Sequence, residues 1–467
     1  MDKVSTPSEA PVPDTPTIAA RKPIDPRHVY RAVLRTGLPS VIGYAATQLY
    51  SLTDMFWVSR LGPEPVAGLA IFGAFYWVIS SVNQIAGAGS VAIIARRYGE
   101  KDIARTQTAI VEAFVLKFVT AAACAVVGYL LTPWIVRLLG AEGEITDHAV
   151  AYGRVMFLGL VFSFPCWTLF TSLRGIDHPR YAMVIMIVSM IFNAILDPFL
   201  IFGLAGLPKL GVAGAAWASN AGFALTVLVG LAMFFRGAFR IRLDWAAVRR
   251  MHVSTLGQMM RIGLPSGISS ISFSLARMVV TPMIAHYGAS YVAVYGAGSR
   301  VIELGIILAV GLELGLSPMI GHALGARDKL LAWVTARKAI GLGVIVMTAF
   351  GAVMAICASP LTRVFFSDPS FGEIGTVFFR VMALQLPFVG AFVLFEGTFM
   401  GAGNTVPTMV IGLIHAWVLQ VPLIWLFSHV LGGGPQGVWW GYVASEGITA
   451  IVYGWWFSRK RWLHQEV

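Results

Sequence analysis

The stretch GLPSVIGYAATQLYSLTDMFWVSRLG, residues 37–62, has the length and apolar content of a membrane-spanning helix, and it contains one carboxylate, Asp54. Pro39 lies fifteen residues earlier, or roughly 22 Å along a helix that rises about 1.5 Å per residue. Inserting an aspartate at the centre of a membrane helix costs about 2.5–3.5 kcal/mol, and such residues usually face a bundle interior. Asp54 is therefore the first candidate functional residue.

The composition of the chain is typical of an α-helical membrane protein. It has 467 residues, 57% hydrophobic and 12% charged, with a mean hydropathy of +0.75, whereas soluble proteins are about 25% charged. The net charge of +11 is concentrated in the connecting segments, which indicates membrane topology, and we expect no nucleic-acid partner. The three cysteines form no metal-binding or disulfide pattern.

Twelve apolar segments are each long enough to cross a bilayer. They cover approximately 35–60, 66–95, 108–132, 147–172, 180–203, 210–235, 258–287, 292–322, 334–358, 373–400, 405–430 and 436–458. Basic residues recur in every second connection and in both terminal flanks. Since basic loops stay in the cytoplasm, we predict a multi-pass protein of the plasma membrane with both termini cytoplasmic.

An internal repeat with an offset of 226 residues runs through the chain. GLPS at 37–40 recurs at 263–266, and the turn GEKD at 99–102 aligns with GARD at 325–328. Each copy holds six segments, so both copies insert in the same orientation. The sequence predicts an all-α polytopic fold of two six-helix bundles related by a pseudo-two-fold axis along the membrane normal, with the substrate site between them.

The repeat divides the chain into five parts. They are a disordered cytoplasmic tail at 1–26, an N-terminal bundle at 27–235, a basic cytoplasmic linker at 236–257, a C-terminal bundle at 258–460 and a short cytoplasmic tail at 461–467. The first tail holds six prolines and no apolar core of a signal peptide. We expect the protein to be a monomer in the lipid bilayer.

Polar residues that break the repeat indicate the functional site. Asp54 aligns with Val280, and Asn193 and Asp197 align with leucines. Asn193 and Asp197 are four residues apart, so they share one helical face. With the hydroxyl of Ser219, they predict a cation site in the N-terminal half only.

The cation at this site is predicted to be H⁺ or Na⁺. Two carboxyl groups that face one site disfavour each other's ionisation, so one of them holds a proton near neutral pH. The same oxygens, with those of Asn193 and Ser219, also suit Na⁺. We expect no cofactor and no other metal. A purely structural alternative is that Asp197-Pro198 kinks the fifth helix and Asp54 pairs locally.

The C-terminal copy holds other ionisable residues at membrane depth: Arg277, Arg300, Glu303, Glu313, Glu396, His415 and Glu446. Arg300 and Glu303 are three residues apart and are expected to pair. Glu313 and Glu396 have no partner nearby in sequence and are candidates for the substrate path. In the N-terminal copy, Lys117 is expected to extend its amine to the membrane surface. No Walker loop, HExxH, CxxC or GxSxG motif is present, so we expect neither ATP coupling nor an enzyme.

Several motifs, in this order, resemble the MATE family, the multidrug and toxic compound extrusion transporters. They are LP at 38–39, TDMFWVSRLG at 53–62, VAGLA at 66–70, RRYGEKD at 96–102, RGIDHPR at 174–180, and NAILDPFLIFG at 193–203 followed by GVAGAAWAS at 211–219. The resemblance covers about residues 30–460. It implies a V-shaped pair of bundles that exports organic cations and other amphiphiles as H⁺ or Na⁺ re-enters.

Within that family the chain looks closest to the prokaryotic DinF-like branch. The branch pattern of a first-helix aspartate and a fifth-helix Asn-x-x-x-Asp is matched by Asp54, Asn193 and Asp197. Tyr50 matches the tyrosine one turn before that aspartate, and Ser219 stands where the branch has threonine. The resemblance therefore implies a supporting role for Tyr50.

The NorM-like branch instead has acids in the seventh and tenth helices. In this chain the corresponding places hold Phe273 and the neighbourhood of Phe388, so a sodium site of that type is not expected. Pro39 is expected to act as a hinge in alternating access.

The predicted function is therefore that of a secondary active antiporter for organic cations or amphiphiles. One alternative is a lipid-linked saccharide flippase of the same superfamily. Its anionic cargo would favour a cationic site, for which Arg277 and Arg300 are candidates, whereas Asp54 and Asp197 argue against it. A membrane-embedded enzyme is the other alternative.

Overall fold

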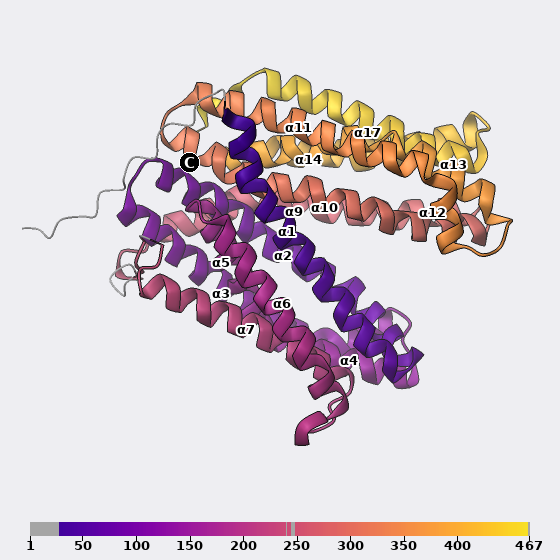
Figure 1. Cartoon of the computed structure of the whole chain (residues 1–467), viewed down its shortest axis with the longest axis horizontal. Helices are drawn as coiled ribbons and strands as arrows, with labels where there is room; N and C mark the ends of the chain where they lie inside the picture. The colour runs from indigo at the N-terminus through magenta and orange to yellow at the C-terminus, as the bar shows by residue number, and fades with distance from the viewer. Residues whose placement is uncertain (1–27, 240, 244–247, 466–467) are drawn as a thin grey trace, which may run out of the picture.

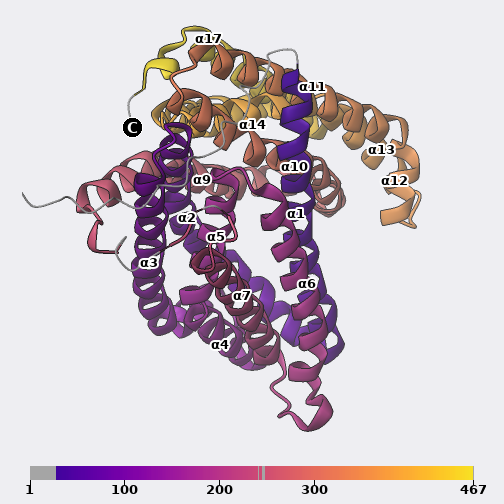
Figure 2. The same cartoon turned by 60° about the vertical axis from the view of Figure 1, so that its left-hand side comes forward.

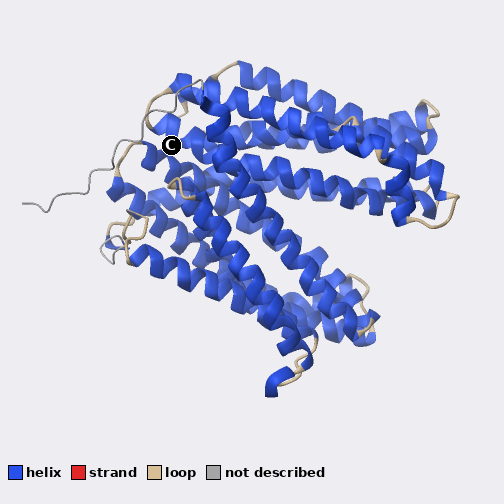
Figure 3. Ribbon diagram, viewed as in Figure 1, coloured by secondary structure: helices blue, strands red, loops and turns tan. Residues whose placement is uncertain are grey.

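The computed structural model describes residues 28–239, 241–243 and 248–465, and these ranges are helical almost throughout, without a strand (Figure 3). Within these ranges, seven single helices are long and apolar enough to cross a membrane, or nine spans if each of two bent pairs counts as one. The predicted all-helical membrane fold is confirmed.

The helices follow the predicted segments in order. The N-terminal half contains α1 (Val29–Val58), α2 (Pro63–Gly99), α3 (Ile103–Leu138), α4 (Gly143–Leu158), α5 (Leu160–Gly175), α6 (Pro179–Phe202) and α7 (Val212–Phe235). The C-terminal half contains α9 (Val253–Ala285), α10 (Ala289–Gly325), α11 (Lys329–Ile356), α12 (Ala358–Phe365), α13 (Phe371–Ala383), α14 (Leu386–Gly401), α15 (Val406–Leu413), α16 (Val421–Trp425) and α17 (Gly434–Ser458). Two π-helical segments, Ile414–Gln420 and Leu426–Val430, follow α15 and α16.

Two predicted spans differ from single straight helices. The fourth is the pair α4 and α5, bent by 54°, and the tenth is the pair α13 and α14, bent by 43°. At the first bend the Asn220 amide donates to the carbonyl of Val155 at 2.7 Å, and a Cβ on Gly159 would lie 1.7 Å from the Asn220 Oδ1. A side chain inserted against the helix backbone is a known cause of a kink.

The internal repeat has the same local structure in both copies. In the turns at 99–102 and 325–328, Lys101 and Arg327 adopt left-handed conformations with φ of 62° and 59°. The next residues, Asp102 and Asp328, cap the first turns of α3 and α11 by accepting backbone N–H groups. A left-handed residue ends one helix and the aspartate begins the next, so both copies reverse direction in the same way.

The two halves meet at one end of the molecule and diverge toward the other, which gives the predicted V shape (Figures 1 and 2). α1 begins and α17 ends where the halves meet. The turns that carry Arg96, Arg97, Arg105 and Arg327 lie at the same end. We call this the basic end.

Three main helix crossings join the halves near the basic end: α1 with α10, α2 with α9, and α2 with α10. A Cβ on Gly315 would lie 2.7 Å from the Cα of Gly37, and a Cβ on Gly263 would lie 1.5 Å from the carbonyl oxygen of Ile85. Gly37 and Gly263 are the first residues of the two GLPS copies. The repeated motif therefore supplies the small residues that let helix backbones touch.

Pro39 is buried beside the first crossing, and α1 continues through it without interruption. Its position next to the contact between the halves suits a hinge, and that role stays a prediction.

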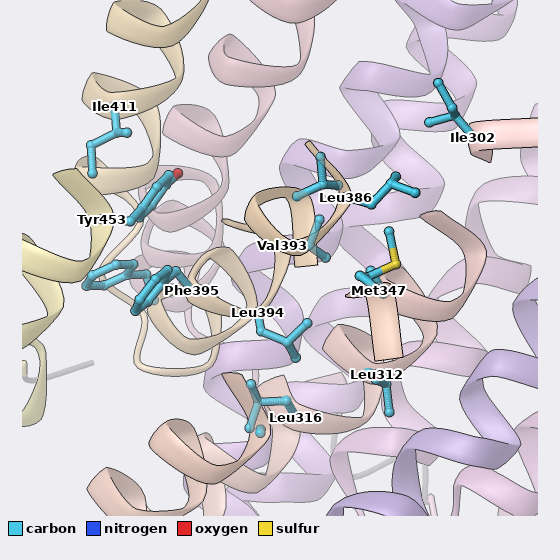
Figure 4. Close-up of a cluster of buried hydrophobic side chains, with 14 of the residues drawn as sticks. Ile302, Leu312, Leu316, Met347, Leu386, Val393, Leu394, Phe395, Ile411 and Tyr453 are labelled. Carbon is cyan, nitrogen blue, oxygen red and sulfur yellow. The ribbon is translucent and has the colours of Figure 1, made fainter. Parts of the chain in front are cut away.

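The C-terminal half is held together by apolar side chains between α10, α11, α14 and α17 (Figure 4). Leu312 and Leu316 face Met347 and Leu394, and the rings of Phe395 and Tyr453 stack at 5.9 Å. In lipid such contacts stabilise through close packing, since lipid tails are as apolar as leucine.

At the basic end, the third helix of each half contacts the first helix of the other half: α3 contacts α9, and α11 contacts α1. Glu112 of α3, whose side chain is fully buried, accepts a hydrogen bond from the His252 backbone N–H at the start of α9 at 2.9 Å. It also pairs with Arg97 at 3.2 Å. The repeat aligns Glu112 with Lys338 of α11, whose amine lies 5.1 Å from the ring of Tyr30 at the start of α1.

We expect Glu112→Gln to loosen the basic end. Glutamine loses the charge that faces Arg97, and hydrogen bonds to charged groups contribute about 1.5–3 kcal/mol. Spin labels at the exposed positions Glu100 and Ala326 of opposite halves should show a longer, broader distance distribution. Asp102→Asn, which removes a charge nearby but keeps the helix cap, is the control. An unchanged distribution in Glu112→Gln would contradict this role.

Candidate cation site

Asp54 lies in the last turn of α1 and is buried, with 6% of its surface exposed. The hydroxyl of Ser219, on α7, donates a hydrogen bond to its Oδ2 at 2.8 Å. The bond connects α7 to α1 through two residues that are 165 positions apart in the sequence. The Asp54 carboxylate, which is energetically costly in a membrane helix, therefore faces the interior of the N-terminal half, where α7 supplies one hydrogen-bond donor.

Asn193 and Asp197 lie on the same face of α6 and are completely buried. The Asn193 amide donates to Oδ1 of Asp197 at 3.2 Å. Both side chains are also within interaction range of the Asp54 carboxyl group. The structure thus gathers the four predicted residues, including Ser219, at the junction of α1, α6 and α7.

The cluster has more hydrogen-bond acceptors than donors. Oδ1 of Asp54, Oδ1 of Asn193 and Oδ2 of Asp197 are buried and lack any protein donor. Buried polar atoms almost always have partners, so three orphaned oxygens at one place point to a missing positive group. A proton on one carboxyl would turn it into a donor for the other, and a bound Na⁺ would be ligated by the same oxygens.

Tyr50 lies one turn before Asp54 on α1. Its ring stacks on Phe223 of α7 at 5.6 Å, and its buried hydroxyl has no hydrogen-bond partner. A Cβ on Gly222 would lie 3.5 Å from this hydroxyl, so the close approach of α7 leaves the group beside the cluster. Tyr50 is therefore placed to offer a proton to an acceptor or an oxygen to a cation.

The cluster does not have the ligands of a transition-metal site. Across the residues that the structure describes, no three His, Cys, Asp or Glu side chains are grouped closely enough to hold a metal ion. The available donors are carboxylate, amide and hydroxyl oxygens, which suit hard cations.

Glu313 and Glu396 lie together in the C-terminal half, apart from this cluster. Glu313 of α10 packs over Gly397 of α14, where a Cβ would lie 2.4 Å from the Glu313 Cγ. Glu396 and Arg174 are both within electrostatic range of Glu313. Arg174 comes from the end of α5 in the other half and is 6% exposed, so it brings a buried positive charge to the acids. Their role in the substrate path stays a prediction.

Two basic residues are buried by contacts that the sequence did not reveal. Arg174 lies beside the connection between α5 and α6, and it is buried within electrostatic range of Glu313 of the opposite half. Lys117 was expected at the membrane surface, and this is wrong, because it is 1% exposed and donates to the backbone and side-chain oxygens of Asn83. The predicted pair of Arg300 and Glu303 is confirmed at 3.2 Å. The contacts of Arg174 and Lys117 are tertiary, and no local sequence signal gives them.

Comparison with known proteins gives the family. A family model described as MatE matches residues 39–199 and again residues 265–426, so its two matches begin 226 residues apart (39 against 265). The chain belongs to the MatE family. The doubled match has the offset of the internal repeat, so the family unit is one half of the molecule. The protein is thus a MATE family transporter.

Relatives of similar length agree with this. The chain is 25% identical to the probable multidrug resistance protein YoeA of Bacillus subtilis, covering 91% of this chain and 93% of that protein. It is 28% identical to the probable multidrug resistance protein NorM of Pseudomonas putida, covering 94% and 97%. Among solved structures, the outward-facing form of a multidrug resistance MATE family transporter superposes with a TM-score of 0.85, at 26% identity, over 94% of this chain and 97% of that one.

Proposed function

We propose that this MATE transporter is a secondary active multidrug efflux antiporter that exports organic cations or amphiphiles in exchange for H⁺ or Na⁺. The observation that carries the proposal is the buried, acceptor-rich cluster at Asp54 and Asp197, which lacks a positive partner. The relatives named above for multidrug resistance support the substrate class. The DinF-like branch and a monomeric state stay predictions.

α1 connects the ion to the conformation of the whole protein. Its last turn carries Asp54, while Gly37 and Pro39 in its first half pack at the crossing with α10 of the other half. Neutralising the paired carboxyl groups removes their repulsion and changes the hydrogen bonds of α1 with α6 and α7. A cation drives a conformational change only if it binds the two states with different affinity. Because α1 belongs both to the cation site and to the crossing with α10, it links the two.

The orientation follows from charge. If the basic end is cytoplasmic, as basic loops favour, both termini are cytoplasmic and the halves diverge toward the outside of the plasma membrane. Substrate then leaves from the outward-facing form, which binds H⁺ or Na⁺ at Asp54 and Asp197, and the loaded protein returns inward.

The flippase alternative loses support from the C-terminal half. Arg277 and Arg300 both lie against Glu303, at 3.9 and 3.2 Å, so an acidic side chain already partners these cations. We therefore retain the antiporter.

Transport into liposomes with pH and sodium gradients imposed separately tests the proposal. The purified full-length chain should move a fluorescent organic cation against its gradient under one of the two ion gradients. A protonophore should abolish transport driven by pH, and a sodium ionophore should abolish transport driven by sodium. Transport that ignores both gradients would rule out ion-coupled antiport.

A further inference from the structure

A second buried ionisable pair lies in the C-terminal half. His415, 1% exposed, places its Nε2 3.6 Å from Oε1 of Glu446, whose side chain is 14% exposed. His415 belongs to the π-helical segment Ile414–Gln420, and Glu446 belongs to α17. π-helical turns are rare and occur frequently at functional sites, and ionisable residues at membrane depth are usually functional.

The repeat places this pair on the counterparts of the helices that form the N-terminal cation site. His415 aligns with Ser189 of α6, and Glu446 aligns with Asn220 of α7. Equivalent helices of the two halves therefore carry ionisable residues at different positions: Asp197 lies on α6, whereas His415 and Glu446 lie on the counterparts of α6 and α7. The N-terminal counterparts do not titrate, so the His–Glu pair is specific to the C-terminal half.

The hydrogen bonds of Thr449 determine where one proton of His415 lies. The Thr449 hydroxyl donates its only proton to the Ser445 carbonyl at 2.7 Å. At 2.8 Å from the Nδ1 of His415 it must then accept, so Nδ1 carries a hydrogen. In a neutral imidazole the Nε2 lone pair consequently faces Glu446.

This tautomer makes the pair a holder of one exchangeable proton. If Glu446 is a carboxylate, Nε2 must be protonated to face it favourably; if Nε2 carries a lone pair, Glu446 must be the acid. In both cases a single proton lies between the two groups and the pair is neutral. Losing that proton leaves a buried negative charge, and gaining another leaves a buried positive charge.

The surroundings of the pair are aromatic with few charges. The rings of Phe273 and Phe392 lie 5.2 and 6.3 Å from the imidazole. The ionisable groups around Glu446 are Tyr442 and Tyr453 of α17, which in turn interact with Arg277 of α9 and with Glu396 and Glu313 of α14 and α10. A cation that enters this half meets aromatic faces and carboxyl groups, a setting that favours organic cations.

We propose that His415 and Glu446 form a second proton-binding site of this transporter, which releases its proton to water when an organic cation binds. The inference rests on the proposed function, because it assumes that organic cations are substrates. A bound cation raises the local potential and so disfavours the proton that the pair holds. Binding of substrate and release of the proton are then linked.

Proton counting tests this directly. Purified full-length protein in weakly buffered detergent is titrated with tetraphenylphosphonium, a lipophilic organic cation, and a pH-sensitive dye records released protons. Glu446→Gln should release about one proton fewer per bound cation than wild type, because it leaves a neutral imidazole with no exchangeable proton to lose. The control is Trp417→Phe, in the same π-helical segment as His415. It loses a 2.8 Å hydrogen bond to Ser272 of α9 but no ionisable group, and it should match wild type.

Two outcomes overturn the inference. One is that Glu446→Gln, with wild-type thermal stability, releases as many protons as wild type. The other is that the wild-type protein binds tetraphenylphosphonium without releasing protons. Failure of the proposed function is distinguishable, because it shows as absence of transport in wild-type liposomes under either gradient. Proton release can be counted whichever ion drives transport.

Discussion

Asp54→Asn is expected to abolish ion-driven export while leaving the fold and substrate binding intact. Asparagine has the same size, and its amide oxygen accepts the hydrogen bond of Ser219, which now reaches Asp54 at 2.8 Å. It neither takes up a proton nor adds a negative charge beside Asp197. The equilibrium between the conformations then no longer responds to the ion. Since coupling energies of about 1–3 kcal/mol correspond to about five- to 150-fold changes, gradient-driven transport should fall by at least about fivefold.

The experiment separates coupling from binding. Accumulation of a fluorescent organic cation under an imposed gradient should fall close to the level of protein-free liposomes, whereas the variant should still bind the substrate in detergent. Asp197→Asn should behave alike. Asp147→Asn, on an exposed position of α4, is the matched control and should transport as wild type does. Full gradient-driven transport in Asp54→Asn would refute the role of the cluster.

The candidate site was predictable because the repeat provides an internal comparison. Val280 stands where Asp54 does, so the fold itself does not need an acid there. Spacing put Asn193 and Asp197 on one face, and the structure adds that this face meets α1 and α7. Sequence supplied the residue set, while the distances and the orphaned acceptor atoms required the structure.

Other features could not be predicted, because they depend on contacts between distant helices. Asn220 inserts beside Gly159 and bends a span that appears continuous by hydropathy. Glu112 accepts a hydrogen bond from the backbone N–H of His252, 140 residues later in the sequence. His415 and Thr449, which are also hydrogen-bonded, lie on different helices. Hydropathy gives the length and order of spans, and it says nothing about which faces pair or where a polar side chain finds its partner.

Gly263→Ala is expected to prevent the basic end from closing. A Cβ at this position would lie 1.5 Å from the carbonyl oxygen of Ile85, so α9 must move away from α2. The atom in the way belongs to helix backbone and has no rotamer by which to escape. Overpacking of this kind costs about 1–3 kcal/mol or more. A shift of that size changes the ratio of closed to open forms by about five- to 150-fold, and transport should fall accordingly.

The control for this substitution lies in the same helix. Gly257 has open space around it, and alanine favours a helix by up to about 1 kcal/mol over glycine, so Gly257→Ala should keep activity. Spin labels at Glu100 and Ala326 should separate in Gly263→Ala and not in Gly257→Ala. If Gly263→Ala keeps both the short distance and normal transport, the backbones are not in contact in the working protein. In that case the repeated GLPS motif has another role than packing α1 and α9 against the opposite half.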